Sequence, residues 1–359
     1  MRPANLLGVT GDRLHLVGDD PATPRPSRWR LAGRAALLAV GAAALYGLAP
    51  RILDVWEEAP RIETIGWFGL AAMVGLEALS FAAVWRLQRI IVPELDAFSA
   101  ATSQLTSNAV SRAVPGGAAF GAGVNIRMWV VAGVAPARAA AGMATVSLIS
   151  TGTLLALPIV SFLVATIYAP VPQNLAVVAV GGAVLSAALF AFAGMFLAHL
   201  PFASWIAGLV HAVGERLGRL LGRPGPSVVD MLEHREELLR TLGRRWHVAL
   251  AASVANWGLD YLVLVAALVF LGANPRFSVV LLAYGAAAVL AMIPITPGGV
   301  GFVEAGLTSL LVVAGVPAAD ALLATLAYRI ASYWLPLPAG LVAWLAFRRR
   351  YERTRTSSA

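Results

Sequence analysis

A long stretch of this chain, from Ala139 to Ala198, contains no Asp, Glu, Lys or Arg. A helix needs about 20 apolar residues to cross the hydrocarbon core of a bilayer, so this stretch is long enough for two crossings. The whole chain is 59% hydrophobic and only 13% charged, whereas a soluble domain has roughly a quarter of its residues charged. The sequence therefore predicts an all-α, polytopic membrane protein.

The 359 residues include 27 arginines and no lysine, and the formal net charge is +8. Membrane proteins collect basic residues in their cytoplasmic loops, so we attribute the charge to topology and expect no nucleic-acid partner. The absence of cysteine excludes disulfides, iron–sulfur clusters and a cysteine nucleophile. The heavy use of alanine and arginine indicates a high-GC bacterial genome, and we predict a location in the bacterial cytoplasmic membrane.

Hydropathy divides the chain into a membrane domain with polar ends. We predict a cytoplasmic tail at 1–30, a membrane domain at 31–347 and a basic tail at 348–359. Six full spans are expected, at Leu31–Ala49, Gly66–Trp85, Ala139–Tyr168, Asn174–Ala198, Val248–Leu271 and Asp320–Phe347.

The arginines orient these spans. On the predicted topology, 21 of the 27 arginines fall on one side, which the positive-inside rule makes cytoplasmic. Both termini are then cytoplasmic. The loop at 199–247 lies on the same side, and its amphipathic part, Pro201–Leu221, is expected to lie at the membrane interface.

Two further apolar segments, Ala97–Val134 and Phe277–Val316, do not fit as simple spans. Pro-Gly-Gly interrupts each of them, at 115–117 and at 297–299. Proline breaks the helical hydrogen-bond ladder, and glycine permits the sharp turn that follows. Because the predicted topology puts both ends of each segment on one side, we expect two re-entrant helical hairpins, one entering from the cytoplasm and one from outside.

The two hairpins are similar in sequence. A shift of 182 residues superimposes the two Pro-Gly-Gly motifs and also places VVAGV at 130–134 on VVAGV at 312–316. The span before each hairpin carries one acid, Glu77 in the first and Asp260 in the second. We therefore predict two repeats of opposite orientation, at about 66–168 and 248–347. Many transporters have this inverted arrangement, with the binding site where the broken helices meet.

Three stretches in the second repeat resemble a known family: IPITPGGVGFVEAGL at 293–307, AGVP at 314–317 and LAYRIASYWLPLPAG at 326–340. They are similar to the transmembrane region of bacterial lysylphosphatidylglycerol synthases, a flippase-like domain that also occurs as free-standing proteins. The resemblance covers about 31–347. It implies translocation of a lipid between leaflets. The family's aminoacyl-transferase activity belongs to a separate soluble domain, so we expect this chain not to be an enzyme and to need no cofactor.

Charged side chains in the hydrocarbon region are rare and face the protein interior or a wet cavity, so they are candidates for function. The intramembrane acids are Glu77 and Asp260, and we expect no metal site. The predicted substrate-binding residues are Glu304, Arg329, Arg127, Asn125, Gly298, Gly299, Gly116 and Gly117. Arginine suits a lipid phosphate because its planar fork matches the phosphate oxygens. The glycines expose backbone N–H groups at the start of a half-helix, where an anion binds well.

Each of these assignments has a structural alternative. Glu304 is also expected as a helix cap, or as the partner of Arg329 in a buried ion pair that fixes the hairpin. Arg112 and Arg127 on the first hairpin can instead extend toward the cytoplasmic surface. The two hairpin tips can dock on each other for packing alone.

The leading hypothesis is a lipid translocator. A polar cavity between the repeats would admit the headgroup of an anionic phospholipid, glycolipid or polyprenyl phosphate while the tails stay in the bilayer. The alternatives are a proton-coupled transporter of a small solute and a non-catalytic accessory subunit of an envelope lipid or glycan assembly complex. A homo-oligomer is also open.

Overall fold

A computed structural model describes residues 65–113, 117–168, 173–221, 245–274, 276–292 and 297–356, together with residues 233 and 236. The described residues all belong to one compact unit, Ala43–Ala359. The predicted span Leu31–Ala49, the tail at 1–30 and Gly116 lie outside the described residues.

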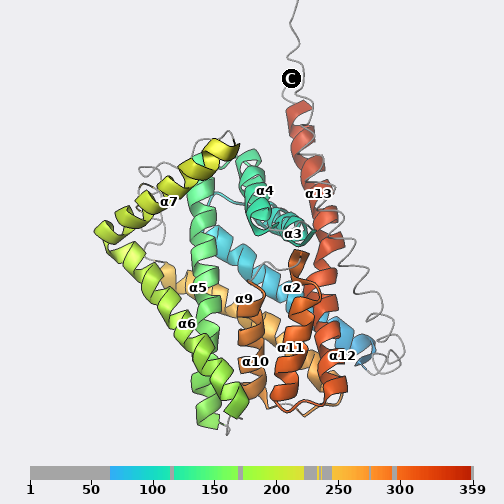
Figure 1. Cartoon of the computed structure of the whole chain (residues 1–359). Helices are drawn as coiled ribbons and strands as arrows, with labels where there is room; N and C mark the ends of the chain where they lie inside the picture. The colour runs from blue at the N-terminus through green and yellow to red at the C-terminus, as the bar shows by residue number, and fades with distance from the viewer. Residues whose placement is uncertain are drawn as a thin grey trace, which may run out of the picture. The chain divides into compact units, whose positions relative to one another are not determined.

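The described residues form helices joined by short connections (Figure 1). The long helices are α2 (Gly66–Ile91), α3 (Ala97–Ala113), α4 (Gly117–Val131), α5 (Pro136–Tyr168), α6 (Gln173–Ala198), α7 (Leu200–Leu221), α9 (Trp246–Phe270), α10 (Phe277–Leu290), α11 (Phe302–Val313), α12 (Ala318–Arg329) and α13 (Pro336–Thr356). Two short turns interrupt the second half: the 3₁₀ turn η2 (Pro297–Gly299) and the π-helical turn η3 (Ile330–Trp334).

Four of the described helical segments are long and apolar enough to cross a membrane, namely Gly66–Ile91, Pro136–Val164, Trp246–Phe270 and Ala318–Tyr351. A fifth crossing results if Val180–Phe196 and Leu200–Leu209, bent by 102° against each other, are counted as one span. The predicted span Asn174–Ala198 corresponds to α6 (Gln173–Ala198), which contains no charged residue and continues into α7 across this bend. The last predicted span is not a uniform helix, because η3 interrupts it.

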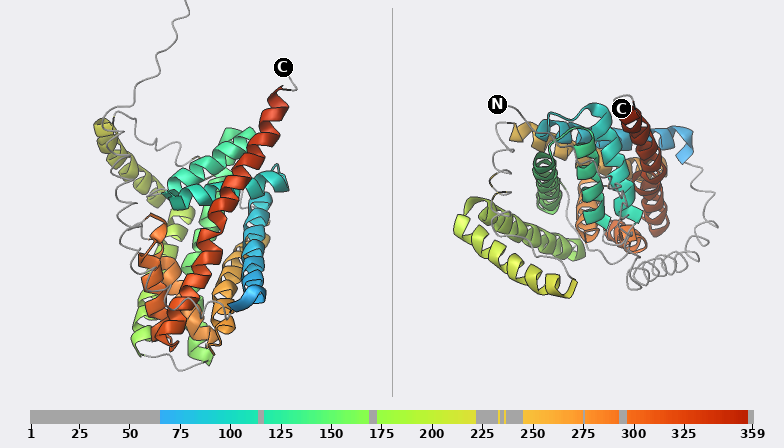
Figure 2. Two further views of the ribbon diagram at one scale, coloured as in Figure 1. Left: turned by 90° about the vertical axis from the view of Figure 1, so that its right-hand side faces the viewer. Right: turned by 90° about the horizontal axis from the view of Figure 1, so that it is seen from above.

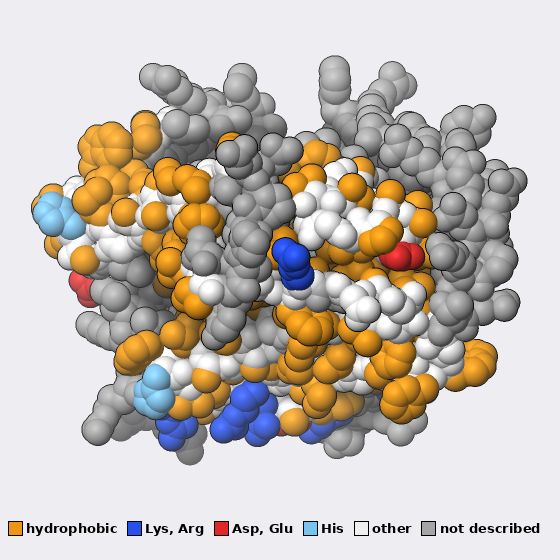
Figure 3. All heavy atoms as spheres, turned by 90° about the horizontal axis from the view of Figure 1, so that it is seen from below, with side chains coloured by type: hydrophobic (Ala, Val, Ile, Leu, Met, Phe, Trp, Pro, Cys, Tyr) orange, Lys and Arg blue, Asp and Glu red, His pale blue; other side chains and the backbone are white. Residues whose placement is uncertain are grey.

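Lipid-facing helices should expose large apolar side chains, and these do. Trp67 is 87% exposed, Ile167 is 73% exposed and Val177 is 74% exposed. Figure 3 shows one face of the molecule on which hydrophobic side chains predominate and charged ones are few. This surface is typical of a membrane protein.

The helices α2 and α9 pack side by side in opposite directions. Phe68, near the start of α2, makes an edge-to-face contact with Phe270 at the end of α9. At mid-helix, Asn256 donates to the Ser80 hydroxyl at 2.7 Å and to its carbonyl at 3.2 Å, and the Ser80 hydroxyl bonds the Asn256 carbonyl at 3.1 Å. Gly69 allows the close approach, because a Cβ there would lie 2.9 Å from the Phe270 ring.

Two further helix pairs join the first half of the chain to the second. Antiparallel α3 and α13 are tied by Thr106, whose hydroxyl donates to the Gly340 carbonyl at 3.3 Å, and by Ser99, whose hydroxyl lies 2.7 Å from that of Tyr351. Antiparallel α5 and α10 are tied by Ser161, whose hydroxyl donates to the Leu281 carbonyl at 3.3 Å. In each pair, a helix that precedes a Pro-Gly-Gly break packs on the last helix of the other repeat: α3 packs on α13, and α10 packs on α5.

The order of the helices repeats at the same shift as the sequence motifs. Pro136, where α5 begins, shifted by 182 residues gives Ala318, where α12 begins. The starts of α2, α3 and α4, shifted in the same way, fall two or three residues from the starts of α9, α10 and α11. Figures 1 and 2 place α3 and α4 at the end where α13 finishes, and α10 and α11 toward the other end.

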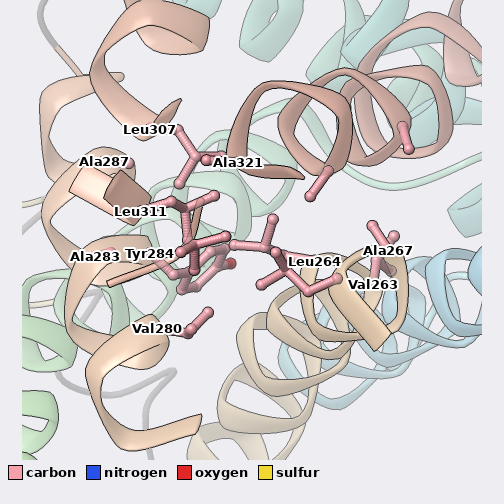
Figure 4. Packing of buried hydrophobic residues seen from close by; sticks show 14 of the residues in the cluster. Val263, Leu264, Ala267, Val280, Ala283, Tyr284, Ala287, Leu307, Leu311 and Ala321 are labelled. Carbon is pink, nitrogen blue, oxygen red and sulfur yellow. The ribbon is translucent and has the colours of Figure 1, made fainter. Parts of the chain in front are cut away.

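The main hydrophobic core belongs to the second half of the chain. Residues from α9, α10, α11 and α12 meet there, and Leu264, Leu307 and Leu311 are among its fully buried members (Figure 4). Tyr284 on α10 lies in the same core but carries a hydroxyl that must find a polar partner. The core therefore positions one edge of the polar site described below.

Candidate functional site: a polar cavity between the two halves

A cavity of about 510 Å³ lies among α2, α3, α5, α9 and the segment from η2 to η3. Its polar lining residues are Glu77, Ser80, Gln104, Asn108, Arg112, Ser147, Ser150, Thr151, Asn256, Asp260, Tyr328, Arg329, Ser332 and Tyr333. Side chains from both halves of the chain line it. A cavity with this lining is unusual between membrane helices, where polar groups are costly.

One group of the lining residues is acidic. Glu77 on α2 is only 6% exposed and lines the cavity together with Asp260 on α9 and Arg112 on α3. Asp260 accepts two short hydrogen bonds at Oδ2, from the Tyr284 hydroxyl at 2.5 Å and from the Tyr328 hydroxyl at 2.6 Å. The two predicted intramembrane acids therefore meet in one place.

A second group of lining residues is basic. The guanidinium groups of Arg112 and Arg329 both lie over the ring of Tyr333, at 5.1 and 4.1 Å from its centroid. Arg112 Nη1 donates to the Tyr333 carbonyl at 2.8 Å, and the Tyr333 hydroxyl contacts the Arg112 carbonyl at 3.3 Å. Arg112 thus extends into the cavity, and the alternative in which it reaches toward the cytoplasmic surface does not fit this geometry.

Glu304 lies behind the basic group and has two partners. Its Oε2 accepts the backbone N–H of Gly301 at 2.7 Å, which satisfies the N-cap amide of α11. Its Oε1 lies 2.7 Å from Arg329 Nε, and the two side chains are only 14% and 10% exposed. The helix cap and the ion pair considered from the sequence are therefore both present, and Glu304 reaches the cavity only through Arg329.

The glycines of the second break are placed by their backbone. Gly298 and Gly299 have φ of +61° and +71°, a region that side-chain-bearing residues rarely adopt. The Gly298 carbonyl accepts a hydrogen bond from Arg329 Nη2 at 3.2 Å, and a Cβ on Gly298 would lie 2.0 Å from the Tyr333 hydroxyl. Gly298 thus lines the cavity, and the N-terminus of α11 already has Glu304 as its anionic cap.

In the first hairpin, Gly117 is a packing residue in the structure. A Cβ on Gly117 would lie 2.2 Å from the Ser111 carbonyl oxygen, and Gly121 one turn later approaches Ser111 and Ser107 as closely. The two glycines let α4 pack directly on the backbone of α3. A phosphate contact by the Gly117 N–H stays a prediction.

The structure places Arg127 and Asn125 away from the lining of this cavity. The Arg127 side chain is exposed on α4, whereas Asn125 is completely buried and its amide donates to Gln104 Oε1 at 3.3 Å. Asn125 therefore supports a lining residue, Gln104, and Arg127 has no place among the described lining residues. The sequence could not tell which of the two arginines lines the cavity, because Arg112 precedes and Arg127 follows the same Pro-Gly-Gly break.

The sequence did not predict the three tyrosines of the site, Tyr284, Tyr328 and Tyr333. Tyr328 is adjacent to Arg329 and Tyr333 follows Arg329 by four residues, so both lie near Arg329 on one helical stretch. Tyrosine in an apolar span is common at the membrane interface, so its presence alone gave no signal. The short polar side chains of α5 in the lining, such as Ser147 and Thr151, gave no signal either.

The arrangement presents side chains of both charges to one cavity. In the described walls there is no histidine, and no group of three or more metal-ligating residues occurs among the described residues. The arginines retain N–H donors beyond those used in the contacts above, since each guanidinium has five. These donors could serve an oxyanion such as phosphate.

Comparison with known proteins agrees with a membrane role. A family model described as the lysylphosphatidylglycerol synthase transmembrane region matches residues 34–340. The chain is similar to a UPF0104 membrane protein of Pyrococcus horikoshii, at 31% identity over 33% of this chain and 36% of the relative. A UPF0104 membrane protein of Methanothermobacter thermautotrophicus is 31% identical over 27% of this chain and 28% of the relative. The matches thus span about a third of these curated relatives, and no solved structure matches the chain.

Proposed function

We propose that this chain, which belongs to the lysylphosphatidylglycerol synthase transmembrane-region family, moves a phosphate-bearing lipid between the leaflets of the bacterial cytoplasmic membrane. The lipid headgroup passes through the polar cavity while the acyl or prenyl tails stay in the bilayer. The chain acts as a translocator and not as an enzyme. Anionic phospholipids, glycolipids with a phosphate linkage and polyprenyl phosphates all carry the group that the cavity would bind.

The observation that carries this proposal is the pair of guanidinium groups on Tyr333. Arg112 comes from the first half and Arg329 from the second, and both line the cavity. Charge-assisted hydrogen bonds from arginine to phosphate are strong and directional. A phosphate between the two arginines would therefore contact both halves of the protein at once.

The reciprocal helix pairing supports an inverted repeat. Helix α3 of the first half packs on α13 of the second half, and α10 of the second half packs on α5 of the first. The α2–α9 pair is antiparallel, as expected for equivalent helices related by an axis in the membrane plane. In such transporters, rocking of one repeat against the other alternates access to the site between them.

An apolar groove gives the lipid tails a place next to the cavity. It has a volume of about 470 Å³ and is lined by Ile65, Gly66, Trp67, Leu70, Met73, Ala327 and Ile330. Tyr328 and Arg329 lie between two of these residues in the chain and line the polar cavity. A headgroup in the cavity and a tail in the groove would thus flank the same helical stretch.

Flipping in proteoliposomes tests the proposal. Headgroup-labelled phospholipid and polyprenyl phosphate are incorporated, and the label left outside is quenched or removed enzymatically to follow transfer. We expect protein-dependent transfer that Arg112→Gln reduces at least tenfold. Arg127→Gln is the matched control, because it removes the same charge from an exposed position, and it should flip at the wild-type rate. Equal transfer rates in folded Arg112→Gln and in the wild type would contradict the proposal that the headgroup passes through this cavity.

The same cavity also suits a small anionic solute carried with a proton, because two acids lie beside the two arginines. Uptake of a labelled solute driven by a pH gradient, in liposomes where no lipid is flipped, would favour this second function.

A further inference from the structure

The acids Glu77 and Asp260 are not needed to bind a phosphate, yet they lie in the same cavity. Glu77 is 6% exposed, and its Oε2 atom has no hydrogen-bond partner among the residues that the structure describes. Asp260 lines the same cavity, and the two acids lie about one helical turn from the Asn256–Ser80 hydrogen bonds on the antiparallel α2–α9 pair. Two acids placed together in the wall of one membrane cavity require an explanation.

Two carboxylates that lie close together and away from water cannot both keep a full negative charge, and one proton held by the pair resolves the conflict. The pair then takes up and releases its proton as a unit. Asp260 is held in place for this role, because Tyr284 and Tyr328 both donate to its Oδ2 atom. Both donors use the same oxygen, so no hydrogen bond from these tyrosines goes to Oδ1.

The charged and titratable groups around the pair come from α3, α10, α12 and η3. They are Arg112 on α3, Tyr284 on α10, Tyr328 and Arg329 on α12, and Tyr333 on η3, while Glu304 on α11 is bound to Arg329. The α5 wall of the cavity supplies only neutral groups, such as Ser147 and Ser150. Arg112 lines the same cavity as both acids, and its positive charge attracts both of them.

We propose that the Glu77–Asp260 pair is a proton-binding site and that each lipid headgroup crosses together with one proton bound there. This inference rests on the proposed function. A metal ion fits the pair less well, because a cation site needs several free oxygen acceptors, and Asp260 Oδ2 is already occupied by two O–H donors.

The coupling follows from Arg112, because its charge acts both on the bound phosphate and on the Glu77–Asp260 pair. In the empty cavity, Arg112 favours a negative charge on Glu77. A phosphate bound to Arg112 offsets that positive charge and so favours a proton on the pair. Linkage requires the converse, so a bound proton strengthens phosphate binding by the same factor. Headgroup and proton therefore travel in the same direction, and a proton gradient directed inward drives the lipid toward the cytoplasmic leaflet.

The steady-state distribution of a labelled phospholipid between leaflets tests this, measured in proteoliposomes with the membrane potential clamped. With one proton per lipid, a gradient of one pH unit shifts the leaflet ratio by up to about tenfold. A passive translocator leaves the ratio unchanged at any gradient. We expect the wild type to accumulate lipid in the leaflet on the alkaline side, with uptake of protons reported by an entrapped pH dye.

Glu77→Gln should abolish the dependence of the ratio on the gradient, as should Asp260→Asn if the first variant is poorly folded. Glu94→Gln is the matched control, since Glu94 is 54% exposed and lies outside the cavity lining, and it should accumulate lipid like the wild type.

The outcomes separate the two proposals. If transfer is rapid but the lipid is distributed equally between the leaflets at every pH gradient, proton coupling is overturned and lipid translocation stands. Accumulation that follows a sodium gradient at equal pH overturns the assignment of the ligand as a proton. The absence of protein-dependent transfer of any labelled lipid overturns both.

Discussion

At the scale of single residues, Tyr333 joins the two halves of the site. Its ring carries the guanidinium groups of Arg112 and Arg329 on its surface, and its hydroxyl lies next to Gly298. A cation–π contact is worth about 2 kcal/mol or more when it is shielded from water. The tyrosine therefore holds two like charges in one small space, with Glu304 balancing one of them.

The Glu304–Arg329 pair should behave as a unit. Arg329→Gln leaves the Glu304 carboxylate buried without its cation, so we expect a loss of stability of about 3 kcal/mol. The double variant Glu304→Gln/Arg329→Gln removes both charges and keeps an acceptor for the Gly301 N–H, so it should be more stable than Arg329→Gln alone. Unfolding midpoints in detergent measure this cycle. Additive losses would show that the pair makes no specific contribution.

The backbone at Gly298 should tolerate no side chain. Gly298→Ala faces a positive φ, which costs roughly 1–2 kcal/mol, and also a clash with Tyr333, which adds about 1–3 kcal/mol. Gly315→Ala is the matched control, because Gly315 has φ +91° but open space around the added Cβ. Thermal unfolding should rank Gly298→Ala clearly below Gly315→Ala. Equal losses would mean that Tyr333 moves aside freely.

At the scale of elements, the breaks in the helices position the site. The π-helical turn η3 lies between Arg329 and α13 and carries Tyr333, whose carbonyl Arg112 reaches. π-turns inside helices occur often at functional sites. The first break follows α3, whose buried face is rich in serine and threonine and packs on α13. Arg112, near the end of α3, thus reaches the π-helical turn η3 of the other half.

The start of α3 is tied to the end of α13 by a contact that depends on pH. Asp96 Oδ1 caps α3 by accepting the Ser99 N–H at 2.9 Å, and its Oδ2 lies 3.0 Å from Arg350 Nη1. Partial burial acts to raise the pKa of Asp96, but the hydrogen bonds from Ser99 and the charge of Arg350 outweigh it, so the pKa lies below the ordinary value.

A lowered pKa in the folded state gives stability that is present above the ordinary aspartate pKa and lost as the pH falls through the lowered value. The contribution should be below about 1 kcal/mol, because both side chains are about half exposed. Asp96→Asn keeps the cap without the charge. Its unfolding midpoint should be slightly lower than that of the wild type at neutral pH and equal to it in acid. A difference that persists in acid would contradict this assignment.

The sequence predicts several of these elements because their signals are local. Proline and glycine mark the break at 297–299, and the amphipathic period of Pro201–Leu221 corresponds to α7. The π-turn left no such mark, since Ile330–Trp334 reads as ordinary helix. The choice between Arg112 and Arg127 depends on the packing of Gly117 and Gly121 on α3, which fixes how the two helices face each other. That information lies in the tertiary structure.

At the scale of the whole molecule, the account depends on a cavity that both halves build. The pairing of α2 with α9, of α3 with α13 and of α10 with α5 leaves Arg112, Glu77, Asp260 and Arg329 facing one space. The repeat in the sequence predicted that the halves are related. It could not predict that their charged residues meet, because a 182-residue shift contains no information on contacts between the copies.

The most direct test of the central claim is to fill the cavity and then empty it in the same protein. The chain has no cysteine, so Ser147→Cys introduces a single thiol into the cavity wall, where Ser147 is exposed to the space. Ser204→Cys places a thiol on the exposed surface of α7 as the control. Both variants are labelled to completion with a bulky methanethiosulfonate reagent, and lipid flipping is measured before labelling, after labelling and after reduction.

The account predicts that labelling stops flipping in Ser147→Cys, that reduction restores it, and that Ser204→Cys flips at one rate throughout. Unchanged flipping in fully labelled Ser147→Cys would contradict the claim that the headgroup crosses through this cavity.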